Sequence, residues 1–163
     1  MALTTSHYPG VTDLFIKDTV MIDRNGEARL ADFGILTFVS RLPTHFIPNS
    51  LLSPIDATIR WMSPELFDPG GSWPGSGQPT KESDYYALGM VILEVLSGAP
   101  PFPYVNYRSI KSSIIDGARP RRPGGARFTD ALWGITEQCW LLNPNDRPTA
   151  EAVLQSLEQA SKL

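Results

Sequence analysis

The apolar positions of this chain recur at helical spacing in its second half. The strongest pattern covers residues 83–97, which are apolar on nearly every side, as in a helix buried at the centre of a domain. Ser83 or Thr80 can cap its start, because a hydroxyl oxygen accepts the unpaired N–H groups of a first turn. Gly98 can end it, since glycine readily adopts the left-handed conformation of a helix C-terminus.

Three further helices are predicted toward the C-terminus. Residues 106–116 form one, which ends at Gly117. Residues 129–142 form another, with an apolar stripe at spacings of three and four that consists of Leu132, Ile135, Cys139 and Trp140. A last helix begins after Thr149, and its inner face is supplied by Val153, Leu157 and Ala160.

The first half of the chain has shorter patterns. Apolar runs at 19–22 and 28–31 flank Asn25-Gly26, a strong signal for a tight turn, and predict a two-stranded hairpin. No period holds over residues 35–59, which we expect to form a long loop. Residues 68–80 are rich in Gly, Pro and Ser and predict a flexible insertion.

Composition narrows the class of protein. The chain has 163 residues, enough for one domain, and a net charge of −3, which gives no overall attraction to nucleic acid or anionic membrane. A lone cysteine, Cys139, excludes an intrachain disulfide and favours an intracellular, cytoplasmic protein. With two histidines, a zinc site is not expected. The apolar region at 85–96 is too short to span a bilayer.

Four arginines form a local basic cluster: Arg119, Arg121, Arg122 and Arg127. A surface that binds nucleic acid usually has aromatic side chains among its basic ones, and only Phe128 lies near this cluster in the sequence. We therefore interpret the cluster as a solvated connector between two helices, and expect no nucleic acid or membrane among the partners.

Five segments, read together, resemble the C-terminal lobe of a eukaryotic protein kinase. They occur in the family's order within residues 19–158, and they are ADFG (31–34), RWMSPE (60–65), KESDYYALG (81–89), SGAPPF (97–102) and CWLLNPNDRPT (139–149). The local sequences around Trp61 and Trp140 are similar to those of the tyrosine-kinase-like group. The resemblance implies a mainly helical lobe with a small β-hairpin at its N-terminal edge.

The resemblance also implies roles for the residues around a nucleotide. Asp32 would hold Mg²⁺ against the phosphates of ATP, and Phe33 and Gly34 complete the Asp-Phe-Gly motif at the cofactor site. Residues 32–65 would be the activation segment. Its last part, with Thr58, Arg60 and Trp61, corresponds to the loop that positions the substrate, and Thr58 favours Ser/Thr acceptors.

Three matched residues have structural roles in the family. Glu65 resembles a buried glutamate that pairs with an arginine, to which Arg147 corresponds. Asp84 resembles an aspartate at a helix start that anchors the backbone of the catalytic loop. Asp84 can also have a simpler role, because the dipole of a helix favours an acidic residue in its first turn.

The catalytic loop departs from the family pattern. The family's Mg²⁺-binding asparagine falls on Thr19, thirteen residues before Asp32, and the catalytic base falls on Leu14, which cannot accept a proton. Asp13 lies one residue out of register, and an insertion of one residue would restore it as the base. No Gly-x-Gly-x-x-Gly precedes Asp32, so we expect the ATP-covering N-terminal lobe to be absent.

Together these features predict a partial kinase domain over 19–158, preceded by a degraded catalytic-loop region (1–18) and followed by a short tail (159–163). The family activity is ATP-dependent phosphorylation of Ser or Thr on a protein, and we expect the chain by itself to be inactive. Three hypotheses stay open: a fragment of an active kinase, a pseudokinase that binds a signalling partner, and an unrelated helical domain.

Overall fold

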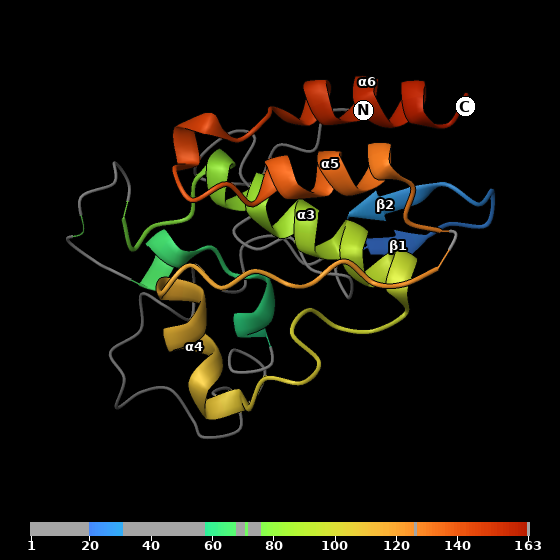
Figure 1. Cartoon of the computed structure of the whole chain (residues 1–163). Coiled ribbons are helices and arrows are strands. Elements are labelled where there is room, and N and C mark those ends of the chain that lie inside the picture. The colour runs from blue at the N-terminus through green and yellow to red at the C-terminus, as the bar shows by residue number, and fades with distance from the viewer. Residues whose placement is uncertain (1–19, 31–57, 68–70, 72–75, 126, 163) are drawn as a thin grey trace.

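Helices dominate the architecture. The computed structural model describes residues 20–30, 58–67, 71, 76–125 and 127–162. Within these ranges it contains a two-stranded antiparallel sheet, β1 (Val20–Ile22) and β2 (Ala28–Leu30), and four α-helices (Figure 1). The helices are α3 (Lys81–Ser97), α4 (Tyr107–Ile115), α5 (Asp130–Cys139) and α6 (Ala150–Ala160). The predicted fold class, mainly helical with a small β-hairpin, is confirmed.

Three single-turn 3-10 helices complete the described elements: η3 (Ile59–Trp61), η4 (Pro64–Phe67) and η5 (Pro144–Asp146). The first two lie in a stretch for which no helix was predicted. Their turns are too short to produce a hydrophobic period, and the long-range contacts described below hold them in place.

Helix α3 forms the centre of the domain. It begins two residues before the predicted start, because Thr80 and Ser83 cap each other. The Ser83 backbone N–H donates to the Thr80 hydroxyl (3.2 Å), and the Thr80 N–H donates to the Ser83 hydroxyl (2.9 Å). Gly98 ends the helix in the left-handed region with φ 74°. Tyr86 and Met90 are completely buried, but Val95 is 62% exposed, so the expectation of burial on nearly every side is too broad.

The helices form stacked layers. Helix α5 packs on α3, α6 packs on α5, and α4 lies on the other side of α3 beside η3 and η4 (Figure 1). Helix α5 ends at Cys139, three residues before the predicted end. The apolar pattern continues through Leu141 and Leu142, but these side chains are exposed and leave the helical path.

Close approach of α3 and α5 depends on Gly89. A Cβ at this position would lie 2.7 Å from the Cβ of Cys139 and 3.2 Å from the carbonyl oxygen of Thr136. The two backbones therefore meet where α3 has no side chain. Cys139 is fully buried at this contact, and burial raises the pKa of its thiol to about 12.

The hairpin forms at the predicted turn. Gly26 has φ 81°, and the Asp23 carboxylate accepts the N–H groups of Asn25 (2.8 Å) and Glu27 (3.0 Å). Strand pairing runs from Val20 opposite Leu30 to Ile22 opposite Ala28.

Two predicted irregular segments fall largely outside the described residues. Only Thr58 and Ile59 are described near the end of the expected loop, and Ile59 belongs to η3. Of the expected insertion at 68–80, the structure describes residues 71 and 76–80, where Thr80 caps α3. Among the described helices, none combines the length and the apolar character that crossing a membrane requires.

Candidate functional site

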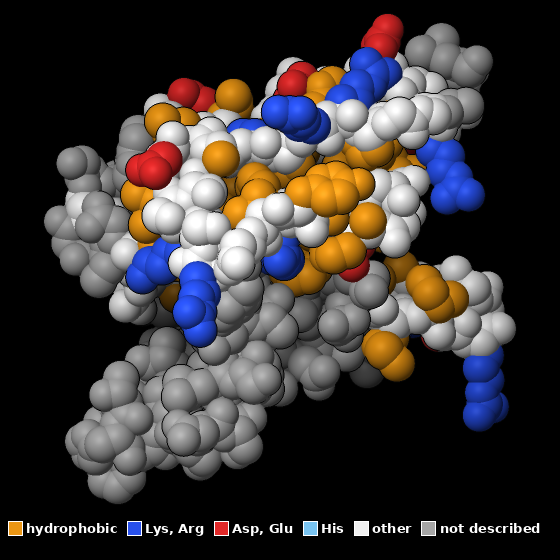
Figure 2. Space-filling model, turned by 60° about the horizontal axis from the view of Figure 1, so that its bottom comes forward, with side chains coloured by type: hydrophobic (Ala, Val, Ile, Leu, Met, Phe, Trp, Pro, Cys, Tyr) orange, Lys and Arg blue, Asp and Glu red, His pale blue; other side chains and the backbone are white. Residues whose placement is uncertain are grey.

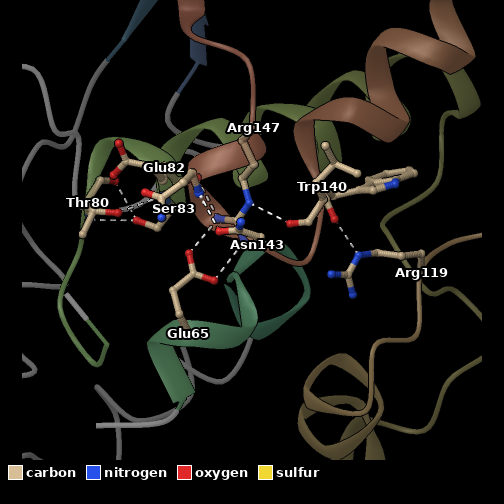
Figure 3. Close-up of polar contacts among 10 residues, drawn as sticks. Glu65, Thr80, Glu82, Ser83, Arg119, Trp140, Asn143 and Arg147 are labelled. Atoms are coloured by element: carbon tan, nitrogen blue, oxygen red, sulfur yellow. Dashed lines mark hydrogen bonds and ion pairs between the residues drawn. The ribbon is translucent and has the colours of Figure 1, made fainter. Parts of the chain in front are cut away.

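A buried ion pair joins the segment before α3 to the segment after α5. Arg147 meets Glu65 with two parallel bonds, Nη1 to Oε1 at 2.6 Å and Nη2 to Oε2 at 2.9 Å (Figure 3). The exposed fractions of the two side chains are 0% and 1%. This bidentate geometry matches the planar guanidinium to the planar carboxylate and compensates both charges in a dry site.

The other donors of Arg147 are also used. Its Nη1 donates to the Glu82 carbonyl at 2.8 Å, and its Nε donates to the Leu141 carbonyl at 2.9 Å. The arginine therefore binds η4, the first turn of α3 and the segment that follows α5 at once. The residues that the sequence pairs by resemblance are in contact, and their contact fixes the C-terminal end of the proposed activation segment.

A buried tyrosine contacts two guanidinium groups, one of which belongs to this pair. The ring of Tyr86 has the Arg147 guanidinium carbon 5.1 Å from its centroid and that of Arg119 at 5.3 Å. Arg119 also donates from Nε to the Trp140 carbonyl at 2.8 Å (Figure 3). Arg119 is thus half-buried and part of the packing, which corrects its interpretation as a purely solvated connector residue.

The Tyr86 hydroxyl is buried and has no hydrogen-bond partner within the described part of the chain. Burial raises the pKa of this phenol to about 12, although the two neighbouring arginines act in the opposite direction. Both Tyr86 and Cys139 therefore keep their protons in the folded state at pH values where the unfolded chain loses them.

We expect stability to fall above about pH 9, because the unfolded state then binds fewer protons than the folded state. The loss continues up to about pH 12, the folded pKa of both groups. Tyr86→Phe should be neutral or stabilising at pH 7, because it removes an unpaired buried hydroxyl. It should also flatten the alkaline decline, by up to about 1.4 kcal/mol per pH unit.

Urea unfolding of the wild type and Tyr86→Phe at neutral and alkaline pH measures both effects. A loss above about 1 kcal/mol for Tyr86→Phe at pH 7 would mean that the hydroxyl has a partner.

Two further residues fix the proposed substrate-positioning loop. Trp61 is 9% exposed, and its indole N–H donates to the Glu94 carboxylate on α3 at 3.1 Å. Arg60 donates to the carbonyls of Pro101 (3.0 Å), Phe102 (2.5 Å) and Val105 (3.4 Å). The loop that enters α4 is therefore tied directly to η3.

Phe102 adopts φ 53°, a left-handed conformation that is uncommon for a bulky residue. Its side chain is 5% exposed in the core, and the Arg60 guanidinium donates hydrogen bonds to the backbone carbonyls around this turn. Packing and the arginine together hold this strained turn. Thr58, the threonine expected in the substrate-positioning loop, is half-buried directly before η3.

The remaining predicted site residues are placed as follows. Asp84 lies half-buried in the first turn of α3. The residues expected to bind ATP and Mg²⁺ or to act as base, namely Asp13, Thr19, Asp32, Phe33 and Gly34, lie outside the described residues. In the described ranges no three His, Cys, Asp or Glu side chains gather as a metal site would require.

Glu94, Tyr86 and the anchoring role of Arg60 were not predicted from the sequence. The available signal for Glu94 was an acid inside the apolar pattern of α3, because a carboxylate on a buried helix needs a partner. Tyr86 and Arg60 gave no local signal, since their partners lie far along the chain.

Comparison with known proteins now adds to this geometry. The protein kinase domain family matches residues 3–157. The chain is 27% identical over 141 residues to vascular endothelial growth factor receptor 3 of Danio rerio, which covers 85% of the chain and 9% of the receptor. It is 28% identical over 151 residues to mitogen-activated protein kinase kinase kinase mkh1 of Cytospora mali (91% and 8%). It is 31% identical over 136 residues to protein kinase wis1 of Schizosaccharomyces pombe (79% and 20%).

The chain thus spans only a small part of each of these relatives, at most 20% of their length. The family match, by contrast, covers nearly all of the chain, including both partners of the buried pair. The chain belongs to the protein kinase domain family.

Proposed function

We propose that this chain is the substrate-positioning C-terminal lobe of a Ser/Thr protein kinase of the tyrosine-kinase-like group. The family reaction transfers the γ-phosphoryl group of ATP to a protein hydroxyl. The observation that carries the proposal is the anchoring of residues 58–65 on the helical core. Arg60, Trp61 and Glu65 each bind a different element across this short stretch.

Such anchoring suits the chemistry of phosphoryl transfer. The reaction depends on holding the acceptor hydroxyl in line with the phosphate, and a rigid platform lowers the entropic cost of that alignment. Thr58 begins the anchored stretch and supports the preference for Ser/Thr acceptors. Trp61 and Trp140 support the assignment to the tyrosine-kinase-like group, because the sequences around them resemble those of that group.

The chain by itself is proposed to be inactive. Leu14 stands at the register of the catalytic base, and Thr19 stands where an asparagine would bind Mg²⁺. A leucine cannot take the proton of the acceptor hydroxyl, and Thr is a weaker metal ligand than Asn. ATP and Mg²⁺ belong to the proposal through Asp32, Phe33 and Gly34, which keep the family sequence. We further propose that the chain acts on a protein substrate or binds a signalling partner, and that it does so in the cytoplasm.

A second candidate is a pseudokinase module that binds a partner and transfers no phosphate. The same positions, Leu14 and Thr19, favour it. The described core also closes through the Glu65–Arg147 pair, which needs no nucleotide.

A phosphoryl-transfer assay with radiolabelled ATP and Mg²⁺ tests the activity of the purified chain. The acceptors are peptides that carry Ser, Thr or Tyr. We expect no transfer above that of an Asp32→Ala control. Mg²⁺-dependent transfer that Asp32→Ala abolishes would overturn the proposed inactivity and the pseudokinase alternative together.

A chimera tests the positioning role separately. Residues 58–158 would replace the corresponding part of an active Ser/Thr kinase, and the chimera is expected to phosphorylate Ser or Thr peptides in preference to Tyr peptides. A folded chimera that binds ATP but transfers nothing would favour the pseudokinase module. Preference for Tyr peptides would contradict the Ser/Thr assignment.

A further inference from the structure

Charge is strongly segregated along this chain. Residues 105–128 hold six Lys or Arg and one Asp, a net charge of +5, whereas all other residues together carry −8. The six cations come from α4 and from the connector between α4 and α5, and they are Arg108, Lys111, Arg119, Arg121, Arg122 and Arg127. They follow one another along the chain, and we refer to the exposed side of this stretch as the basic surface. Figure 2 shows the face that lies at the bottom of Figure 1. Its described part carries blue cationic side chains spaced among orange and white ones, and red carboxylates lie beside some of them at the upper edge.

Within the described residues, carboxylates neutralise few of these cations. Among the described residues, one ion pair involves the basic surface, between Arg122 and Asp130 at 2.7 Å. The Asp130 side chain is 95% exposed, so this pair adds little to stability. Arg108, Lys111, Arg121 and Arg127 are exposed and have no carboxylate partner in the described part of the chain.

Several of the side chains are held in position. Lys111 lies 5.4 Å from the centroid of the Phe67 ring, and Arg119 is held by the Trp140 carbonyl. Arg122 also donates to the Phe128 carbonyl. Pro120 and Pro123 restrict the backbone between the arginines. Such pre-positioning reduces the entropy that a bound ligand would otherwise have to remove.

We propose that the basic surface docks an acidic protein segment, a stretch with several Asp or Glu residues. A short acidic peptide can stay within a stretch of net charge +5, whereas a long polyanion would extend onto the remainder of the chain, which carries −8.

The location gives the surface a connection to η4. Helix α4 packs against η3 and η4, and Lys111 contacts Phe67 directly. A segment bound here would lie beside the platform proposed above to position the substrate. The docking proposal does not depend on phosphoryl transfer, however, and holds equally for an inactive module.

Fluorescence polarisation tests the docking with a labelled peptide of alternating Asp and Glu and its Asn/Gln counterpart. The acidic peptide should bind the full chain, and the neutral peptide should bind much more weakly. Raising salt from about 50 to about 200 mM should weaken binding severalfold, because screening reduces the attraction between exposed charges.

Two double variants locate the site, Arg108→Gln/Lys111→Gln and Arg121→Gln/Arg127→Gln. Each should weaken binding about tenfold, or about 1.4 kcal/mol. The matched control, Arg24→Gln/Lys162→Gln, changes the net charge equally at exposed positions elsewhere and should leave the affinity within about twofold. Unchanged thermal unfolding would show that each variant folds.

Three results would overturn the proposal. The first is equal binding of the acidic and neutral peptides. The second is an equal loss in the control variant, which would reveal bulk charge alone. The third is preferential binding of single-stranded DNA or phosphatidylserine vesicles with the same dependence on the basic surface, which would assign it to nucleic acid or membrane.

Discussion

Arg147→Met should lower the free energy of unfolding by about 3–5 kcal/mol, because it leaves the Glu65 carboxylate buried without its partner. The Glu65 side chain is 1% exposed, so water cannot replace the guanidinium. The variant also removes the bonds that Arg147 donates to the Glu82 and Leu141 carbonyls. Urea unfolding followed by far-ultraviolet circular dichroism measures the change.

An exposed pair provides the control for this variant. Arg122→Met breaks the contact with Asp130, whose side chain is 95% exposed, and should cost no more than about 1 kcal/mol. The double variant Glu65→Met/Arg147→Met should recover part of the lost stability, because no charge is then left buried. Equal effects of Arg147→Met and Arg122→Met would contradict the importance of the buried pair.

Gly89→Ala should destabilise the protein by about 1–3 kcal/mol, although alanine is the better helix former. The new methyl group would lie 2.7 Å from the Cβ of Cys139, a backbone-attached atom that cannot rotate away. Relief requires that α3 and α5 move apart. Thermal unfolding is expected to show a lower midpoint temperature.

Gly134→Ala is the matched substitution, because Gly134 also lies inside a helix, α5, and a Cβ there would meet nothing within 4 Å. We expect it to stabilise the protein by about 1 kcal/mol through helix propensity alone. If Gly89→Ala behaved like Gly134→Ala, the close approach of the two helices would not be a constraint.

Local features of the fold were predictable from the sequence. The turn at Gly26, the cap at Thr80 and the helix end at Gly98 follow from the conformational preferences of single residues. The contact between Glu65 and Arg147 was expected by resemblance to a family, because periodicity gives no information about residues 82 positions apart.

Long-range contacts explain what was not predicted. The short helices η3 and η4 depend on partners such as Glu94 and Pro101, which no local pattern identifies. From the sequence, Arg119 was expected to be a surface charge, yet its guanidinium lies over the Tyr86 ring and donates to the Trp140 carbonyl. Long basic side chains can pack against apolar groups and still carry a charge, so the charge of Arg119 alone did not predict its burial.

The sequence separation of the buried pair has a consequence for biosynthesis. Glu65 leaves the ribosome 82 residues before its partner Arg147, so the nascent chain carries an uncompensated carboxylate while α3, α4 and α5 are being made. The segment around η4 can lock onto the helical core only when the last helix is about to be synthesised. A product terminated anywhere before residue 147 therefore lacks this lock, and we expect cellular proteolysis to remove it.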